Sequence, residues 1–233
     1  MPVLLNIADL EFSYEPDIVS SWRLLVPSFE LRSGQVTVIS GDNMSGKSTF
    51  IGIVGGMIDL GRCRGSIFSA DIGSHSQREL AEKSIVLSAD DKMFPELSVL
   101  QNIAIANRTI PYRKLEQSLD PVKAVLLDSG VLNEAALYAP LASLSSGGRA
   151  LVKLARAYLS PSAIVIVDEI SSFLDETRAE YFLSLTLDLA RAGRGVIIIS
   201  HSERDRQQLL QEASTVQFHI HRQESRSEMR ESK

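Results

Sequence analysis

The clearest feature of the sequence is a series of short apolar runs. Residues 163–167 are all apolar, residues 196–200 are apolar up to a final serine, and residues 35–40 form a mostly β-branched run with polar residues at its ends. Runs of this length are typical of strands that are buried on both faces of a parallel sheet. Residues 84–88 and 215–220 are two further strand candidates.

Between these runs, apolar residues recur at helical spacing. Leu151, Leu154, Ala155 and Tyr158 follow the i, i+3, i+4, i+7 pattern of an amphipathic helix over residues 148–159. The same spacing, with glycines and prolines as breaks, predicts further helices over residues 47–55, 177–191 and 203–212.

Strands that alternate with helices predict an α/β fold with a mostly parallel sheet flanked by helices. Residues 97–140 differ, because prolines and glycines break them into several short helical segments, so we expect a helical subdomain at roughly 90–160. Ligands of parallel sheets bind at the carboxyl ends of the strands. Gly41, the pair Asp168–Glu169 and His201 all follow buried runs, which predicts that they meet at one edge of the sheet.

Composition and charge narrow the possible functions. The chain has 233 residues, a formal net charge of −5 and no basic patch, so we expect no nucleic-acid partner. Its single cysteine, Cys63, cannot form an internal disulfide, which fits a reducing, cytoplasmic compartment. The first residues do not resemble a signal peptide, and no apolar stretch approaches the ~20 residues that span a bilayer. Charges of both signs in residues 221–233 predict a disordered tail after one domain over 1–220.

Residues 41–48 match the pattern G-x-x-x-x-G-K-[ST] without exception. Gly41 and Gly46 allow tight backbone turns, so that successive N–H groups can surround phosphate oxygens. Lys47 can reach the β- and γ-phosphates, and the Ser48 hydroxyl can bind Mg²⁺. A glycine turn without function is the alternative, but a predicted strand before it and a helix after it favour a triphosphate site.

Two acidic residues, Asp168 and Glu169, follow the apolar run 163–167. Asp168 is placed to hold Mg²⁺, directly or through water. Glu169 is placed to polarise an attacking water molecule. The alternative is a pair of acids that cap the next helix, and the phosphate-binding pattern in the same chain makes that interpretation the weaker one.

Two other features are ambiguous when they are taken alone. Residues 145–149, Ser-Ser-Gly-Gly-Arg, form a glycine-rich loop before a helix, which is either a second anion site or a simple helix cap. A lone histidine such as His201 is more often structural than catalytic. Its predicted place beside the other candidates favours a contact with phosphate.

Taken together, these motifs resemble those of the ATP-binding subunit of an ABC transporter, in order, over most of the chain. Residues 41–49 look like its Walker A motif, 144–157 like its signature motif and following helix, and 165–169 like its Walker B motif. Residues 171–175 look like its D-loop. The resemblance implies a P-loop NTPase fold in which an N-terminal antiparallel β part and a helical subdomain accompany the parallel sheet.

The resemblance also implies roles for individual residues. Glu169 and His201 are expected to be catalytic, and Ser48 and Asp168 are expected to hold Mg²⁺. The residues expected to bind ATP are Tyr14, which would stack on adenine, the loop residues Gly41, Asp42, Asn43, Met44, Ser45, Gly46, Lys47, Ser48 and Thr49, and the signature residues Ser146, Gly147, Gly148 and Arg149.

In the mechanism that the resemblance implies, two cassettes pair head to tail. Each ATP then lies between the P-loop of one subunit and the signature loop of the other. The signature loop completes the site in the way that an arginine finger completes other NTPase sites. The expected partners are therefore a second cassette and a transmembrane permease. The expected location is the cytoplasmic face of a membrane.

The chain departs from the family pattern in three places. Ala89 occupies the position of a family glutamine, Ser145 that of the signature's leading leucine, and Arg149 that of its glutamine. The P-loop carries Met44 and Ser45 where small residues with another glycine are commoner. Because Ala89 affects coupling to a membrane partner, a regulator or scaffold that works by ATP-driven dimerisation stays open, as does a degenerate cassette with little turnover.

Overall fold

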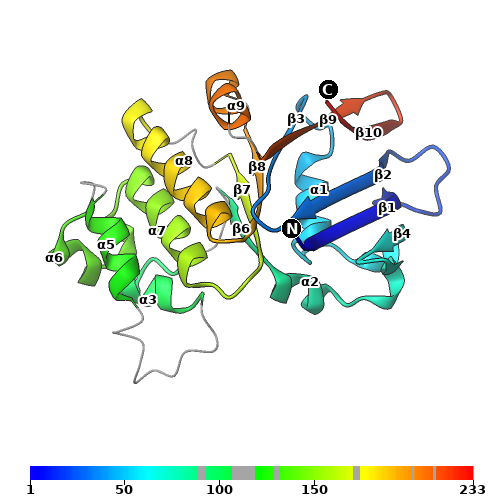
Figure 1. The fold of residues 1–233 in the computed structure, drawn as a ribbon. Coiled ribbons are helices and arrows are strands. Elements are labelled where there is room, and N and C mark those ends of the chain that lie inside the picture. Colours follow the sequence, from blue (N-terminus) through cyan, green and yellow to red (C-terminus); the bar gives the residue numbers. More distant parts are fainter. Residues whose placement is uncertain are drawn as a thin grey trace. The chain divides into compact units, whose positions relative to one another are not determined.

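The computed structural model describes residues 1–88, 93–106, 119–128, 132–169, 174–200, 202–211 and 214–232 (Figure 1). The chain divides into two compact units. The first unit comprises Met1–Val86, Ala163–Glu169 and Leu189–Lys233, and the second comprises Leu87–Ser162 and Ile170–Asp188.

Within the described residues, ten strands form one sheet in the order β5-β4-β1-β2-β10-β9-β3-β8-β7-β6. The strands are β1 Val3–Ser13, β2 Arg23–Arg32, β3 Val36–Gly41, β4 Cys63–Ile67, β5 Ala70–Asp71, β6 Ser84–Ser88, β7 Ile164–Asp168, β8 Gly195–Ile199, β9 Thr215–Arg222 and β10 Arg226–Glu231. The helices are α1 Lys47–Val54, α2 Gln77–Lys83, α3 Val99–Ala104, α5 Asp120–Asp128, α6 Glu134–Tyr138, α7 Ser146–Leu159, α8 Glu176–Arg191 and α9 Glu203–Leu210.

The central part of the sheet is parallel, as the apolar runs predict. Strand β3 pairs in parallel with β8 on one side and with β9 on the other, and β7 pairs in parallel with β8. All five residues of β8 are buried, because neither face of this part of the sheet meets solvent. Strands β1, β2, β4 and β5 pair antiparallel, which confirms the expected N-terminal antiparallel part.

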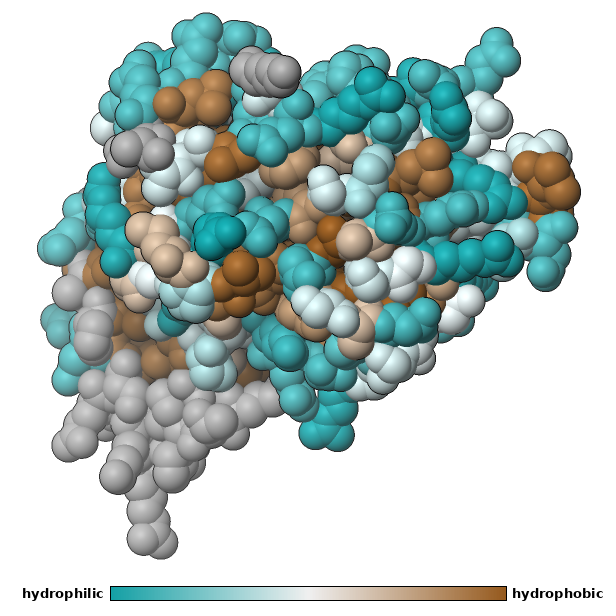
Figure 2. Space-filling model, turned by 45° about the vertical axis from the view of Figure 1, so that its right-hand side comes forward, coloured by the Kyte–Doolittle hydropathy of each residue, from teal (hydrophilic) through white to brown (hydrophobic). Residues whose placement is uncertain are grey.

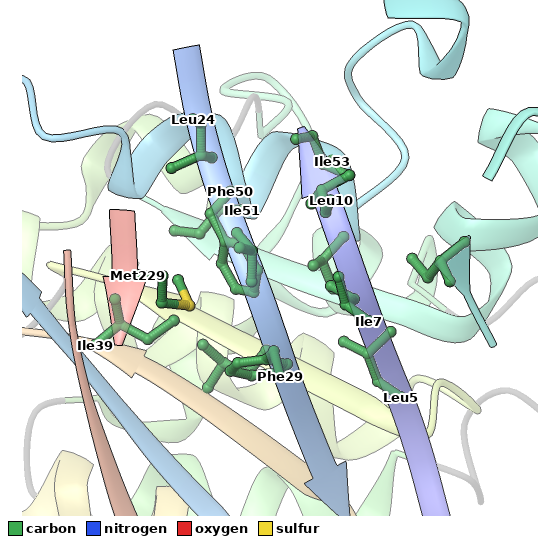
Figure 3. Close-up of a cluster of buried hydrophobic side chains, with 14 of the residues drawn as sticks. Leu5, Ile7, Leu10, Leu24, Phe29, Ile39, Phe50, Ile51, Ile53 and Met229 are labelled. Atoms are coloured by element: carbon green, nitrogen blue, oxygen red, sulfur yellow. The ribbon is translucent and has the colours of Figure 1, made fainter. Parts of the chain in front are cut away.

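The core of the first unit lies between the antiparallel strands and helix α1. Figure 3 shows side chains from β1, β2 and α1 pointing toward one another, and all of them are buried. The rings of Phe29 on β2 and Phe50 on α1 meet edge to face, with their centroids 5.0 Å apart. Seven of the eight residues of α1 are buried. This helix, and therefore the loop that precedes it, is held rigidly against the sheet.

The end of the chain corrects one prediction. Residues 221–233 are expected to be a disordered tail, but Arg226–Glu231 forms strand β10, which lies between β2 and β9. It pairs antiparallel with β9 and parallel with β2. Ser227 and Met229 are buried, Glu228 between them is half-buried, and Arg226, Arg230 and Glu231 are exposed. The prediction is wrong because it rests on the charge of the segment and does not consider that Ser227 and Met229 alternate with the charged residues, as in a strand.

In the second unit, helices α3, α5 and α6 lie near α7 or one another, which matches the expected helical subdomain. Asn102 on α3 is 2% exposed and ties the preceding loop to the helix. Its Oδ1 accepts a hydrogen bond from the Phe94 N–H, and its Nδ2 donates to the carbonyl groups of Phe94, Leu97 and Ser98. One buried amide therefore fixes four backbone groups.

We expect Asn102→Ala to destabilise the protein by about 3 kcal/mol, because it leaves several buried backbone groups without partners. Urea unfolding followed by circular dichroism measures this change. Asn6→Ala is the control, because the Asn6 amide makes one hydrogen bond at an exposed position. Equal stability of the two variants would contradict the role of Asn102.

Among the described residues, no helix is long and apolar enough to cross a membrane. On the face drawn in Figure 2, hydrophobic and hydrophilic residues are interspersed. The exposed large apolar side chains include Val19, Met44 and Met57, which come from separate parts of the sequence.

Candidate nucleotide-binding site

The loop between β3 and α1 carries the P-loop pattern, and its backbone is strained. The φ angles are 150° at Gly41, 59° at Met44 and 106° at Gly46, all in the region that favours glycine. A Cβ atom at Gly41 would lie 2.7 Å from the Ile220 carbonyl oxygen, and one at Gly46 would lie 2.9 Å from the Trp22 ring. Glycine is therefore required at both ends of the loop.

Lys47 lies inside this loop and is only 7% exposed. Its Nζ donates hydrogen bonds to the carbonyl oxygens of Gly41 (2.8 Å) and Asp42 (2.9 Å). Burial lowers the pKa of the ammonium group, while the negative charges of Glu169, Asp168 and Asp42 oppose that shift. A positive charge thus lies at the centre of the loop, where phosphate oxygens can replace the two carbonyl groups as acceptors.

The hydroxyl groups of the loop differ in their surroundings. The Ser45 Oγ is buried and has no hydrogen-bond partner among the described residues. Ser48 is exposed and lines the adjacent pocket. Thr49 is buried, and its Oγ1 lies 3.0 Å from the Tyr14 hydroxyl. Of these groups, the Ser48 hydroxyl is the one available to a bound metal ion.

The register of the parallel strands brings the acidic pair to the same sheet edge as the P-loop. Ile199 on β8 is aligned with Ile39 on β3 and with Asp168 on β7, so the last residue of β7 is level with a residue two positions before the end of β3. The Glu169 N–H donates to the Ile199 carbonyl oxygen at 3.1 Å, and Glu169 adopts a φ of 56°. This strained turn places Glu169 on the wall of the pocket beside the loop.

An aromatic pair forms another wall of the pocket. The rings of Tyr14 and Trp22 are stacked, with 6.4 Å between their centroids and 24° between their planes. Tyr14 is 52% exposed, and Phe12 packs edge to face against it at 4.8 Å. The exposed Tyr14 ring beside the phosphate loop, backed by the partly buried Trp22, provides a surface on which a nucleobase can stack.

The pocket enclosed by these groups has a volume of about 520 Å³. It contains three residues that the sequence analysis does not identify: Trp22, Arg222 and Glu224. Arg222 and Glu224 belong to the segment expected to be disordered. Trp22 is the single tryptophan of the chain and immediately precedes strand β2. This uniqueness is the one feature of the sequence that could have drawn attention to Trp22.

The signature residues lie in the second unit, at the beginning of α7. The Ser145 side chain caps this helix by accepting a hydrogen bond from the Gly148 N–H at 3.2 Å. Gly147 and Gly148 are buried, whereas Ser146 and Arg149 are exposed. The predicted glycine-rich loop is therefore the N-terminus of a 14-residue helix, which favours an anion.

Three features of the sequence analysis lie outside the described residues. They are His201, the first three residues of the expected D-loop at 171–173, and Ala89. Their expected roles remain predictions.

We expect Gly46→Ala to weaken ATP binding by about tenfold or more, because a side chain at this φ is strained and its Cβ would meet the Trp22 ring. Isothermal titration calorimetry measures the affinity. The control is Gly61→Ala, since the nearest atom to a Cβ there is the Asp59 carboxylate oxygen at 3.3 Å. Unchanged ATP affinity of Gly46→Ala would show that the loop accommodates a side chain at this position without losing its shape for phosphate.

Comparison with known proteins identifies a family and several relatives. The protein family described as "ABC transporter" matches residues 25–172. The xylose import ATP-binding protein XylG of Ralstonia nicotianae is 31% identical over 179 residues, covering 75% of this chain and 35% of that protein. The ribose import ATP-binding protein RbsA 2 of Rubrobacter xylanophilus is 32% identical, covering 74% of this chain and 34% of that protein. The chain thus spans about a third of the length of these relatives.

Solved structures share the fold. The dimeric structure of MJ0796, described as a bacterial ABC transporter cassette, matches with a TM-score of 0.74 at 18% identity and covers 98% of both chains. A bacterial Atm1-family ABC exporter with ATP bound matches with a TM-score of 0.70 at 20% identity, covering 95% of this chain and 37% of that chain.

Proposed function

The chain belongs to the ABC transporter family, and on that premise we propose that it binds and hydrolyses ATP to energise transport through a separate transmembrane permease. The observation that supports this function best is the loop 41–48, which holds the Lys47 ammonium at its centre and has Glu169 on the adjacent wall. Such a site carries donors for a triphosphate and a carboxylate for water.

Each group of the pocket has a role in this proposal. The backbone N–H groups of the loop and Lys47 bind the phosphates, and Tyr14 stacks on the adenine. Ser48 and Asp168 would hold Mg²⁺, which would neutralise charge on the phosphate oxygens. Glu169 accepts a proton from the attacking water, and His201 contacts the γ-phosphate.

The signature helix completes the site of a second cassette. Ser146 and Arg149 are exposed at the N-terminus of α7, so they are accessible to a nucleotide held by another subunit. The helix dipole favours a negative charge at that end. We therefore propose a dimer in which each ATP lies between the loop 41–48 of one subunit and Ser146–Arg149 of the other.

The proposed membrane partner is an import permease, because the relatives named above carry import in their names. In this role the chain sits peripherally on the cytoplasmic face of the membrane. Purification of the tagged chain from detergent-solubilised membranes tests the partner, and the expected result is a stable complex with a polytopic permease.

The activity itself is tested on the purified chain. We expect binding of ATP in the presence of Mg²⁺, measured by calorimetry, and release of inorganic phosphate, measured by a coupled assay. If ATP at millimolar concentration neither binds nor raises the melting temperature, the proposal fails.

A second candidate is an ATPase that acts on a soluble protein through ATP-driven dimerisation. Ala89, in place of the family glutamine, is the observation that favours it. Recovery of active, ATP-binding chain from the soluble fraction, with no permease in the solubilised membranes, would favour this candidate over transport.

A further inference from the structure

The hairpin formed by β9 and β10 contacts the apex of the P-loop. Arg222, the last residue of β9, donates a hydrogen bond from its Nη1 to the Met44 carbonyl oxygen at 3.2 Å. Within the described residues, this is the one polar contact that the guanidinium makes. Met44 is the loop residue with a φ of 59° and is 79% exposed, so few other groups hold it in place.

The same hairpin supports the loop at a second point. The Ser227 hydroxyl on β10 accepts a hydrogen bond from the Trp22 Nε1 at 3.2 Å. The far edge of that indole ring lies 2.9 Å from the position that a Cβ atom of Gly46 would take, so the ring packs closely on the loop. Ser227 is fully buried, and the position of the ring is therefore fixed by the hairpin.

The hairpin is itself well anchored. Strand β10 lies between β2 and β9 in the sheet, and the Arg23 N–H donates to the Ser225 carbonyl oxygen at 3.1 Å. Met229 contributes to the core that Figure 3 shows. The hairpin thus supports two residues of the loop: it contacts Met44 directly through Arg222, and it supports Gly46 indirectly through Trp22.

We propose that the β9–β10 hairpin positions the P-loop for nucleotide, with Arg222 holding its apex and Ser227 holding Trp22 against Gly46. This inference rests on the function proposed above. The physical reason is preorganisation: a loop with left-handed residues is costly to order, and contacts that order it before binding raise the affinity for the ligand. Arg222 and Ser227 are positioning residues, since both act through the loop.

The first test is Arg222→Ala, with the affinities for ATP and ADP measured by calorimetry in the presence of Mg²⁺. Loss of one hydrogen bond that involves a charged group is expected to lower the affinity for both nucleotides by about fivefold. The KM for ATP rises by the same factor, while kcat at saturation stays within about twofold of that of the parent. Arg222→Lys is expected to bind ATP more tightly than Arg222→Ala, because an ammonium can still donate to the Met44 carbonyl.

The matched control is Arg226→Ala. Arg226 lies in the same turn, but its guanidinium bonds to the Gln223 side chain and it does not line the pocket. This variant is expected to bind ATP like the parent. If Arg226→Ala and Arg222→Ala lose equal affinity, general disturbance of the hairpin explains the effect and the proposal is overturned.

Ser227→Ala provides an independent test of the second contact. Ser227→Ala is expected to lower the affinities for ATP and ADP by the same factor. In the double variant, its effect should not add fully to that of Arg222→Ala, because both residues act on one loop. Two other results overturn the proposal: unchanged ATP affinity of Arg222→Ala, or loss of affinity for ATP with none for ADP, since the latter indicates direct contact with the γ-phosphate. If the parent chain does not bind ATP, the proposed function fails instead, so the two failures are distinct.

Discussion

Glu169→Gln abolishes ATP turnover and leaves ATP binding intact, if Glu169 is the base of the reaction. The amide has nearly the same shape as the carboxylate but cannot accept the proton of water. Removal of a general base typically slows a reaction by about 100- to 10,000-fold. Binding is retained because Lys47 and the loop are unchanged, and because the wall of the pocket loses a negative charge that opposes the triphosphate. Phosphate release measures turnover, and calorimetry measures binding.

The same variant also tests the shared site. With hydrolysis blocked, ATP is expected to hold two chains together, and size-exclusion chromatography with light scattering reports the dimer. Glu82→Gln is the control, because Glu82 lies on α2 and pairs with Arg78 at the surface. Turnover of Glu169→Gln at the parental rate would remove Glu169 from the mechanism, and a monomer with bound ATP would contradict the shared site.

The sequence predicts the part of the site that depends on local structure. The loop 41–48 and the acidic pair each follow a buried strand, and strands in a parallel sheet end at a common edge. The alignment of Ile39, Ile199 and Asp168 confirms this arrangement. The buried runs identify β3, β7 and β8 because nearly all residues of these strands are buried on both faces of the sheet.

Contacts between distant segments could not be predicted in this way. Trp22 reaches the loop because β2 pairs with β10, whose residues come some 200 positions later in the chain. The sequence does not predict strand β10, because four of its six residues are charged and only Ser227 and Met229 are buried. Only the three-dimensional pairing shows that a charged C-terminal segment contributes Arg222 to the pocket.

Lys47→Ala is expected to lower ATP affinity by about 100-fold or more, because it removes the charge-assisted contact at the centre of the loop. The effect on stability is expected to be small, since two terms oppose each other. Loss of the ammonium leaves the carbonyl groups of Gly41 and Asp42 without their donor, but it also removes a buried charge. Calorimetry gives the affinity, and thermal unfolding without nucleotide gives the stability.

A ligand that binds only the folded state raises the melting temperature, and at a fixed ligand concentration the rise is larger for tighter binding. The parent is therefore expected to melt higher in the presence of ATP, and Lys47→Ala is expected to show no such rise at the same ATP concentration. Lys83→Ala is the matched control, because this lysine is on α2 and its Nζ lies 4.0 Å from the Phe68 ring centroid. This variant is expected to show the same ATP-induced rise in melting temperature as the parent. Because the Lys47 ammonium lies within the phosphate loop, its variant is expected to fail in binding, whereas Glu169→Gln is expected to fail in turnover. If Lys47→Ala kept the ATP-induced rise, the buried ammonium would have a structural role only, and the phosphate site would have to lie elsewhere in the pocket.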